Sequence, residues 1–207
     1  MIAVDGPAAS GKGTIARALA KHFGLPFMDT GLLYRAVALQ LWRWGGDPTN
    51  EFEASRACGD LGFDPDDPEL RSEPVSQFAS AISVYPSVRT ALLKRQQDFA
   101  RQDGGAVLDG RDIGTVIAPE AEVKLFVTAS PEVRAERRLR ELEQRGMHAD
   151  YDDVLADIRA RDRRDSTREV APLRPAPDAI ILDTSNLDID AAVAEAVRLA
   201  EKRLARV

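Results

Sequence analysis

The chain has 207 residues, of which 44% are hydrophobic and 30% charged, and its formal net charge is -6. These values predict an ordinary soluble globular protein of one domain, without an apolar run long enough to span a bilayer. The acidic balance argues against binding of nucleic acid through a basic surface. Cys58 is the single cysteine, which rules out an intrachain disulfide, and no signal peptide is evident, so we expect a cytoplasmic protein.

The first twenty or so residues have the pattern of a phosphate-binding loop. Residues 2–5 read as a buried strand, residues 6–11 as a glycine-bounded turn, and residue 12 onward as a helix with apolar residues at helical spacing. Such a turn directs backbone N–H groups at phosphate oxygens, where the helix dipole and Lys12 add positive charge. Gly13 stands where the common motif has Ser or Thr, and the hydroxyl follows in Thr14. The alternative is a glycine-rich turn that only joins strand to helix.

The rest of the chain alternates predicted strands with predicted helices. Further strands are expected at residues 25–28, 106–108, 123–127 and 179–182. Helices are expected at residues 30–44, within 47–60, at 73–84, 86–101, 131–145 and 150–169, and after Asp188 to the end. Residues 62–68 read as a turn-rich acidic link. This order predicts an α/β fold with a parallel sheet, helices on both faces, and a site at the carboxyl ends of the strands.

The helix predicted after residue 150 carries charged residues on the face that should point inward. Its apolar stripe continues at helical spacing into Arg161, Asp165 and Arg168. A ligand phosphate or sugar is a suitable partner for such charges, and each charge-assisted contact contributes about 1.5 to 3 kcal/mol. The alternative is an internal Arg–Asp network that fixes the helix to its neighbours. We favour the ligand and keep both interpretations.

A carboxylate, Asp109, stands at the end of the strand predicted at residues 106–108. In P-loop proteins a carboxylate in this position holds Mg²⁺ directly or through water. A turn or cap aspartate is the alternative. Arg111 and Asp112 follow in a glycine-flanked turn, and we interpret both as ligand contacts.

Four motifs together make the chain recognisable. They are Gly6-x-x-x-x-Gly-Lys-Gly-Thr14, Asp29-Thr-Gly-x-x-Tyr-Arg35, Asp109-Gly-Arg-Asp-x-Gly-Thr115, and Arg161-Asp-x-Arg-Asp-x-x-Arg168 followed by Ala171-Pro-Leu173. Their combination closely resembles the bacterial cytidylate kinases, a family of the nucleoside monophosphate kinase group. The Gly-Lys-Gly-Thr form of the loop is itself typical of that group.

The resemblance implies a P-loop three-layer fold with a five-stranded parallel sheet and a short lid. It implies one kinase domain over residues 1–207, with a core at 1–29, 102–130 and 175–207, a monophosphate-binding region at about 30–101, and a lid with arginine-rich helices at about 131–170. The implied reaction is ATP-dependent phosphorylation of CMP and dCMP with Mg²⁺. We expect these small molecules as the partners of a monomer that binds no nucleic acid and no membrane.

The resemblance also implies roles for individual residues. The ATP phosphates would be held by the loop and one lid arginine: Gly6, Pro7, Ala8, Ala9, Ser10, Gly11, Lys12, Gly13, Thr14 and Arg137. The CMP phosphate would meet Thr30 and Arg35, with Tyr34 nearby and Arg111 in the phosphate clamp. Cytosine would be read by Ser80, Arg89 and Asp112, and the ribose and phosphates would be held by Arg161, Asp165 and Arg168. The catalytic set would be Lys12, Asp109, Arg111 and Arg137, and Mg²⁺ would be held by Ser10, Thr14 and Asp109, partly through water.

One departure and two alternatives accompany this interpretation. Many family members carry a small antiparallel sheet in the monophosphate-binding region, whereas residues 57–71 are too short and too rich in Pro and Asp to form one. Closure around CMP and discrimination against UMP are therefore in question. A P-loop kinase for UMP, AMP or shikimate would share the loop but not the cytosine-reading set. A guanine-nucleotide switch would need N-K-x-D and D-x-x-G elements, and the sequence has neither.

Overall fold

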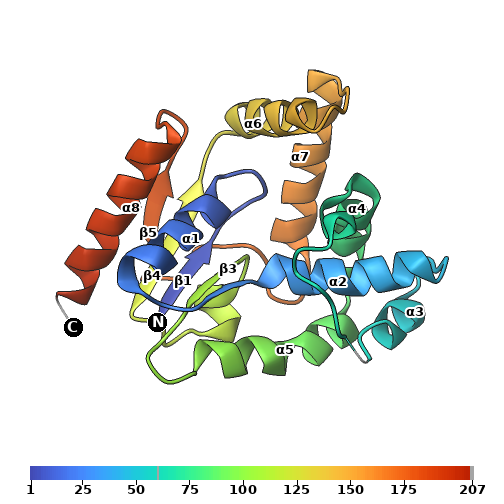
Figure 1. Ribbon diagram of the computed structural model, residues 1–207, viewed down its shortest axis with the longest axis horizontal. Helices are drawn as coiled ribbons and strands as arrows, with labels where there is room; N and C mark the ends of the chain where they lie inside the picture. The colour runs from blue at the N-terminus through green and yellow to red at the C-terminus, as the bar shows by residue number, and fades with distance from the viewer. Residues whose placement is uncertain (60, 206–207) are drawn as a thin grey trace. The chain divides into compact units, whose positions relative to one another are not determined.

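The computed structural model describes residues 1–59 and 61–205 (Figure 1). The chain divides into two compact units, one formed by Met1–Met28 with Ala100–Val207 and the other by Asp29–Phe99. No helix in the described part of the chain is long and apolar enough to cross a membrane.

A five-stranded, all-parallel sheet forms the centre of the first unit. Its order is β2-β3-β1-β4-β5. The central strand is paired on both sides, with Ile2 opposite Val107 and Val123. Because the strands are parallel, their carboxyl ends meet at one edge of the sheet, where a site is expected. The predicted fold class is confirmed. The strands are β1 (Ile2–Asp5), β2 (Phe27–Asp29), β3 (Val107–Gly110), β4 (Val123–Thr128) and β5 (Ile180–Asp183).

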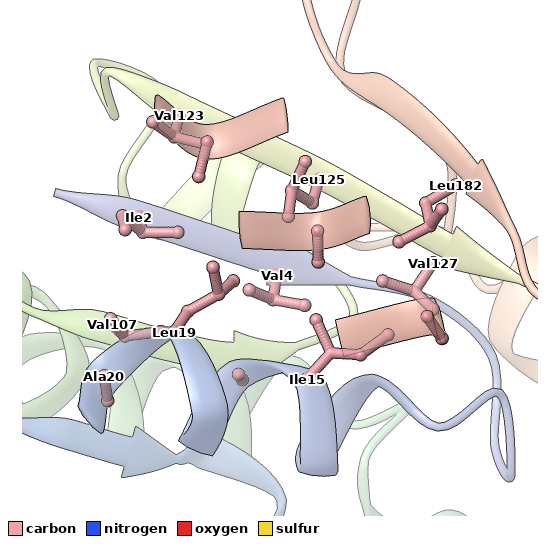
Figure 2. Close-up of a cluster of buried hydrophobic side chains, with 14 residues drawn as sticks. Ile2, Val4, Ile15, Leu19, Ala20, Val107, Val123, Leu125, Val127 and Leu182 are labelled. Carbon is pink, nitrogen blue, oxygen red and sulfur yellow. The ribbon is translucent and has the colours of Figure 1, made fainter. Parts of the chain in front are cut away.

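Helices α1 (Lys12–Phe23) and α8 (Ile189–Leu204) pack with the sheet in one hydrophobic core. Figure 2 shows Ile15 and Leu19 of α1 directed at the strand residues Ile2, Val4 and Leu125. Each such fully buried side chain stabilises the fold by about 1.5 to 3 kcal/mol. Helix α8 contributes only alanines to the fully buried set, and small residues allow a helix to lie close to its neighbours. This core fixes the loop between β1 and α1.

The remaining helices of the first unit follow β3 and β4. They are η2 (Ile113–Ile117), which is a single turn of π-helix, α6 (Pro131–Gln144) and α7 (Tyr151–Thr167). Ser130 caps α6, since its hydroxyl accepts from the Val133 N–H at 3.3 Å, and Asp150 caps α7 in the same way. Helices α6 and α7 pack against each other through Ala135, Leu142 and Val154.

The second unit is helical. Its elements are α2 (Thr30–Arg43), α3 (Glu51–Arg56), η1 (Pro68–Arg71), α4 (Glu73–Ile82) and α5 (Pro86–Ala100). The Asp29 carboxylate accepts from the Gly31 N–H at 3.0 Å and so starts α2. Helix α2 packs on α4, where the rings of Trp42 and Phe78 meet edge to face with centroids 5.0 Å apart.

Two short elements differ from the sequence prediction. The 3-10 helix η1 begins at Pro68, the last residue of the expected turn-rich link, and its other residues had no predicted element; η2 was not expected at all. Between residues 57 and 72 the described residues contain η1 and no strand, as predicted for a shortened insert, and residue 60 lies outside the described residues.

Candidate functional site

The loop between β1 and α1 is a close-fitting turn that leaves no room for a side chain at Gly6. Gly6 has φ 154°, and a Cβ there would lie 2.0 Å from the Val127 carbonyl oxygen. Gly11 and Ala9 also have positive φ, 86° and 57°. Such a conformation is unfavourable for alanine, and non-glycine residues of this kind concentrate at ligand-binding loops. Gly11 caps α1 without a side chain, so no cap competes with an anion for the helix N-terminus.

Lys12 and Asp109 form an ion pair beside this loop. The Lys12 Nζ lies 3.3 Å from the Asp109 Oδ1, and their side chains are 15% and 3% exposed. A Cβ at position 13 would lie 3.0 Å from the Asp109 Oδ2, closer than most real Cβ contacts. The missing side chain at Gly13 therefore allows the carboxylate to approach the start of α1. This is the physical reason for the Gly-Lys-Gly-Thr form of the loop in this chain.

Three oxygen donors of this region suit a hard cation. The Ser10 hydroxyl is buried and has no hydrogen-bond partner within the described residues, and Asp109 is 2% exposed. The third donor is the hydroxyl of Thr14, an exposed residue in the first turn of α1. Mg²⁺ prefers oxygen ligands and keeps several waters, so hydroxyls and one carboxylate fit it better than a dense cluster of ligands would. Residues 1–59 and 61–205 contain no group of three or more His, Cys, Asp or Glu arranged to hold a metal.

The turn after β3 is tied to α7 by two ion pairs. The Arg111 Nε donates to the Asp165 Oδ2 at 2.9 Å, and the Arg168 Nη2 lies 3.7 Å from the Asp112 Oδ1. Asp112, Asp165 and Arg168 are all at least nine-tenths buried. Burial raises the pKa of the Asp165 carboxyl, but the surrounding arginines, Arg111 first, outweigh it and hold that pKa below its usual value.

The inward face of α7 is therefore an Arg–Asp network in this structure. Arg161 adds its charge to the surroundings of Asp165, and the Arg168 Nε donates to the Ala171 carbonyl at 2.8 Å. The network is the alternative that the sequence left open. It does not exclude the ligand role, because guanidinium groups can exchange one oxyanion partner for another. The ligand role of these residues stays a prediction.

Arg137 lies beside the loop and lines a cavity. Its Nη1 donates to the Thr184 hydroxyl at 3.0 Å and its Nη2 to the Thr184 carbonyl at 2.7 Å. The cavity measures about 630 Å³, within the usual range for small-molecule sites. Its walls include loop residues and the segment after β5: Ser10, Gly11, Thr14, Thr184, Leu187 and Asp188. Sequence reasoning did not assign the segment after β5 to a site, because its one recognisable feature there is Asp188 at the start of α8.

Arg134 is a second residue that sequence reasoning missed. It is 3% exposed, and it donates to both carboxylate oxygens of Asp162 on α7 at 2.9 and 2.5 Å. It also donates to the Ala129 carbonyl at 2.9 Å and to the Ala8 carbonyl of the loop at 3.3 Å. Arg134 precedes Arg137 by three residues and so shares its helix face, which was the only available signal.

The remaining predicted residues belong to the second unit. Arg35 donates to the Leu70 carbonyl at 2.9 Å and to the Ser76 hydroxyl at 3.1 Å. The Arg89 guanidinium lies 5.8 Å from the ring centroid of Tyr34, within cation–π range. Thr30, Ser80 and Arg89 are 4%, 5% and 7% exposed. Helices α2, α4 and α5 thus present polar side chains that are buried in the unit, as a base or phosphate site requires.

Comparison with known proteins decides the family. The sequence model of the cytidylate kinase family matches residues 2–202. The chain belongs to the cytidylate kinase family. Among its relatives are cytidylate kinases of Cereibacter sphaeroides, 56% identical over 99% of this chain and 97% of that protein, and of Xanthobacter autotrophicus, 56% identical over 99% of both. The cytidylate kinase of Methylocella silvestris is 54% identical over 97% of this chain and 94% of that protein.

The predicted recognition and enzyme class are confirmed by these matches, since cytidylate kinases are nucleoside monophosphate kinases. A solved structure of an uncharacterized protein from Eubacterium ventriosum has a TM-score of 0.57 at 14% identity, covering 97% of each chain. That likeness concerns the fold alone.

Proposed function

We propose that the protein transfers the γ-phosphoryl group of ATP to CMP and dCMP, giving ADP with CDP or dCDP. Membership of the cytidylate kinase family supports this proposal. The observation that carries it is the turn after β3. Asp109 meets the lysine of the loop, and the next residues, Arg111 and Asp112, enter a buried charge network with α7. A phosphate-binding loop whose lysine meets Asp109, with Arg111 and the buried Arg168 in one charge network beyond it, suits an enzyme that holds two phosphorylated molecules.

The donor would be bound by the loop and the cavity beside it. The loop N–H groups and Lys12 would hold the ATP phosphates at the N-terminus of α1. Arg137 lies in the wall of the same cavity and would add positive charge to the transferred group. Thr184 orients that guanidinium through its hydroxyl and carbonyl oxygens.

The buried Ser10 hydroxyl, the Thr14 hydroxyl and the Asp109 carboxylate would hold Mg²⁺, in part through water. When bound, the ion neutralises charge on the donor phosphates. Lys12 contributes in the same direction, and its Nζ lies 3.3 Å from the Asp109 Oδ1 beside the loop.

The acceptor would be bound by the residues that the family resemblance assigns to it. Ser80, Arg89 and Asp112 offer a hydroxyl, a guanidinium and a carboxylate, which together match the donors and acceptors of a cytosine edge. The acceptor phosphate would meet the hydroxyl and guanidinium groups of Thr30, Arg35 and Arg111, with Tyr34 nearby. The ribose and phosphates would engage Arg161, Asp165 and Arg168. Binding would then replace carboxylate partners of the arginines by ligand oxygens.

The chemistry requires alignment and charge stabilisation. An oxygen of the acceptor phosphate attacks the γ-phosphorus in line, the bond to the oxygen bridging the β- and γ-phosphorus breaks, and ADP leaves with that electron pair. The acceptor oxygen is already ionised, so no general base is needed. Lys12, Arg111 and Arg137 would stabilise the charge on the transferred group. No covalent intermediate with the enzyme forms.

The experiment is ADP formation in a coupled assay with CMP, dCMP, UMP and AMP as separate acceptors. We expect turnover with CMP and dCMP at least about tenfold faster than with UMP or AMP, because the assigned groups match cytosine. Lys12→Ala should lower kcat by at least ~10²-fold, as loss of other preorganised charge stabilisers does. Lys94→Ala removes a lysine whose side chain is 83% exposed and should leave the rate unchanged. Failure to use CMP would refute the proposal, and equal rates with UMP would refute the base-reading assignment.

A further inference from the structure

Asp5 is a buried carboxylate that the proposed reaction does not use. It is the last residue of β1, it directly precedes the loop, and it is 5% exposed. Its Oδ1 accepts from the Ile113 N–H at 2.8 Å, and its Oδ2 accepts from the Gly114 N–H at 2.8 Å. A buried carboxylate needs such donors, since an unpaired charge in the interior is strongly unfavourable.

The two donors are the first N–H groups of η2. The later amides of this turn bond within it, as the Ile117 N–H donates to the Asp112 carbonyl and the Ala118 N–H to the Ile113 carbonyl. The first N–H groups of a helix have no partner in the helix itself. Asp5 supplies both missing acceptors and thereby joins the end of β1 to the turn that carries Arg111 and Asp112.

The position of Asp5 is fixed by the sheet. Strand β1 pairs on both sides, and Asp5 stands opposite Gly110 of β3 and Phe126 of β4. The turn is closely packed as well, because a Cβ at Gly114 would lie 3.2 Å from the Lys124 Cδ and 3.4 Å from the Asp5 Oδ2. The Lys124 Nζ is directed at Asp178, with both contacts at 2.9 Å. The Asp5 carboxylate is thus held by main-chain N–H groups.

We propose that Asp5 is a positioning residue for the acceptor: by holding the first two amides of η2 it sets where Arg111 and Asp112 lie. This inference rests on the roles proposed above for Arg111 and Asp112. It adds a specific function for the last residue of β1, the central strand of the sheet. Burial, with a smaller effect of the Asp112 and Asp109 charges, raises the pKa of Asp5 to about 7, whereas the two N–H donors act in the opposite direction and favour the carboxylate.

Asp5→Asn tests the inference, because asparagine keeps the size of the side chain but turns one acceptor into a donor that faces an N–H. We expect the KM for CMP to rise about tenfold, the effect of one lost buried hydrogen bond, and the KM for ATP to stay within about twofold. The loop remains held by the pairing of β1. The Ile113 and Gly114 amides should exchange hydrogen faster in this variant than in the wild-type protein.

Val123→Ala is the matched control. Val123 is fully buried in the same sheet, opposite Ile2 at the far end of β1 from Asp5, so its truncation loosens the core without touching the turn. We expect both KM values to be unchanged in this control. An equal rise of the two KM values in Asp5→Asn, or no rise, would overturn the inference.

Amide exchange in the wild-type protein decides the matter if Asp5→Asn does not fold. The Ile113 and Gly114 amides should be protected, and exchange as fast as in exposed loops would overturn the inference. Wild-type protein that does not phosphorylate CMP would refute the proposed function. The exchange rates of the two amides in Asp5→Asn would still report on the connection between Asp5 and η2.

Discussion

At the scale of single residues, Gly13 shows how the absence of a side chain shapes the site. The Asp109 Oδ2 lies close to the backbone of Gly13. A Cβ at position 13 would be only 3.0 Å from this oxygen. The other carboxylate oxygen of Asp109, Oδ1, lies 3.3 Å from the Lys12 Nζ. One missing methyl group therefore sets the distance between the loop and the carboxylate of the next strand.

Gly13→Ser, which restores the common form of the motif, should therefore impair the enzyme. The added Cβ would push the Asp109 carboxylate away from Lys12, and overpacking of this kind costs about 1–3 kcal/mol of the free energy of unfolding. We expect kcat to fall at least about tenfold, since displaced preorganised charges lose transition-state stabilisation. Gly62→Ser is the matched control, because no heavy atom lies within 4 Å of its Cβ position. Steady-state kinetics and urea unfolding measure both, and an unchanged kcat in Gly13→Ser would contradict the argument.

The sequence predicted the position of a site residue only where neighbouring residues form a recognisable motif. The spacing of glycines around Lys12 predicts the loop, and the close approach of Gly13 to Asp109 agrees with an expected carboxylate beside it. Arg134 and Thr184 carry no such pattern, because their importance comes from partners 28 and 47 residues away, Asp162 and Arg137. The ligand roles of the predicted site residues and the division of the chain into core, lid and monophosphate-binding region remain predictions.

At the scale of elements, helix ends were predicted well because caps are local. Ser130 with Pro131 begins α6 and Asp188 begins α8, as the sequence indicates. The turn η2 was missed for the opposite reason. Its apolar sequence fits a strand or a loop equally well, and the acceptor for its first amides, Asp5, lies 108 residues earlier. No window of neighbouring residues contains that information.

The bond between Arg134 and Asp162 should be the strongest single link between α6 and α7. Both guanidinium contacts are shorter than 3 Å, and Arg134 is 3% exposed. Truncating one partner of a buried pair typically lowers the free energy of unfolding by about 3–5 kcal/mol. We expect a double-mutant cycle of Arg134→Met and Asp162→Asn, measured by urea unfolding, to give a coupling of about 1–3 kcal/mol.

The pair of Lys94 and Asp98 on α5 is the control for that cycle. Its side chains are 83% and 62% exposed, so water screens their attraction and the coupling should be much smaller. Similar coupling energies in the two cycles would contradict the argument, because the Arg134–Asp162 pair would then stabilise the fold no more than an exposed ion pair does.

At the scale of the whole molecule, two buried carboxylates make the free energy of unfolding depend on pH in opposite directions. The pKa of Asp165 is lowered, so its contribution to the free energy of unfolding is present at neutral pH and is lost as pH falls through the folded pKa, below 3.8. The pKa of Asp5 is raised from 3.8 to about 7. Between these values the folded state binds more protons than the unfolded state, so this contribution is largest below pH 3.8 and is lost as pH rises to about 7.

Urea unfolding at pH values from 4 to 8 should show the effect of Asp5. The free energy of unfolding of the wild-type protein, minus that of Asp5→Asn, should fall with rising pH by an amount on the order of 4 kcal/mol at most. The slope should flatten above pH 7, where the carboxyl is ionised in both states. Parallel curves for the two proteins would show that the Asp5 carboxyl has an ordinary pKa in the folded state.

The central place of β1 in the sheet has a consequence for biosynthesis. Ile2 pairs with Val107 and Val123, so the partners of this early strand leave the ribosome only after most of the chain has been made. Pairings between such distant parallel strands form slowly, and unpaired strand edges associate readily with other chains. During translation the apolar residues of β1 therefore have no strand partners, and we expect the nascent chain to be the stage at which this protein associates most readily with other chains.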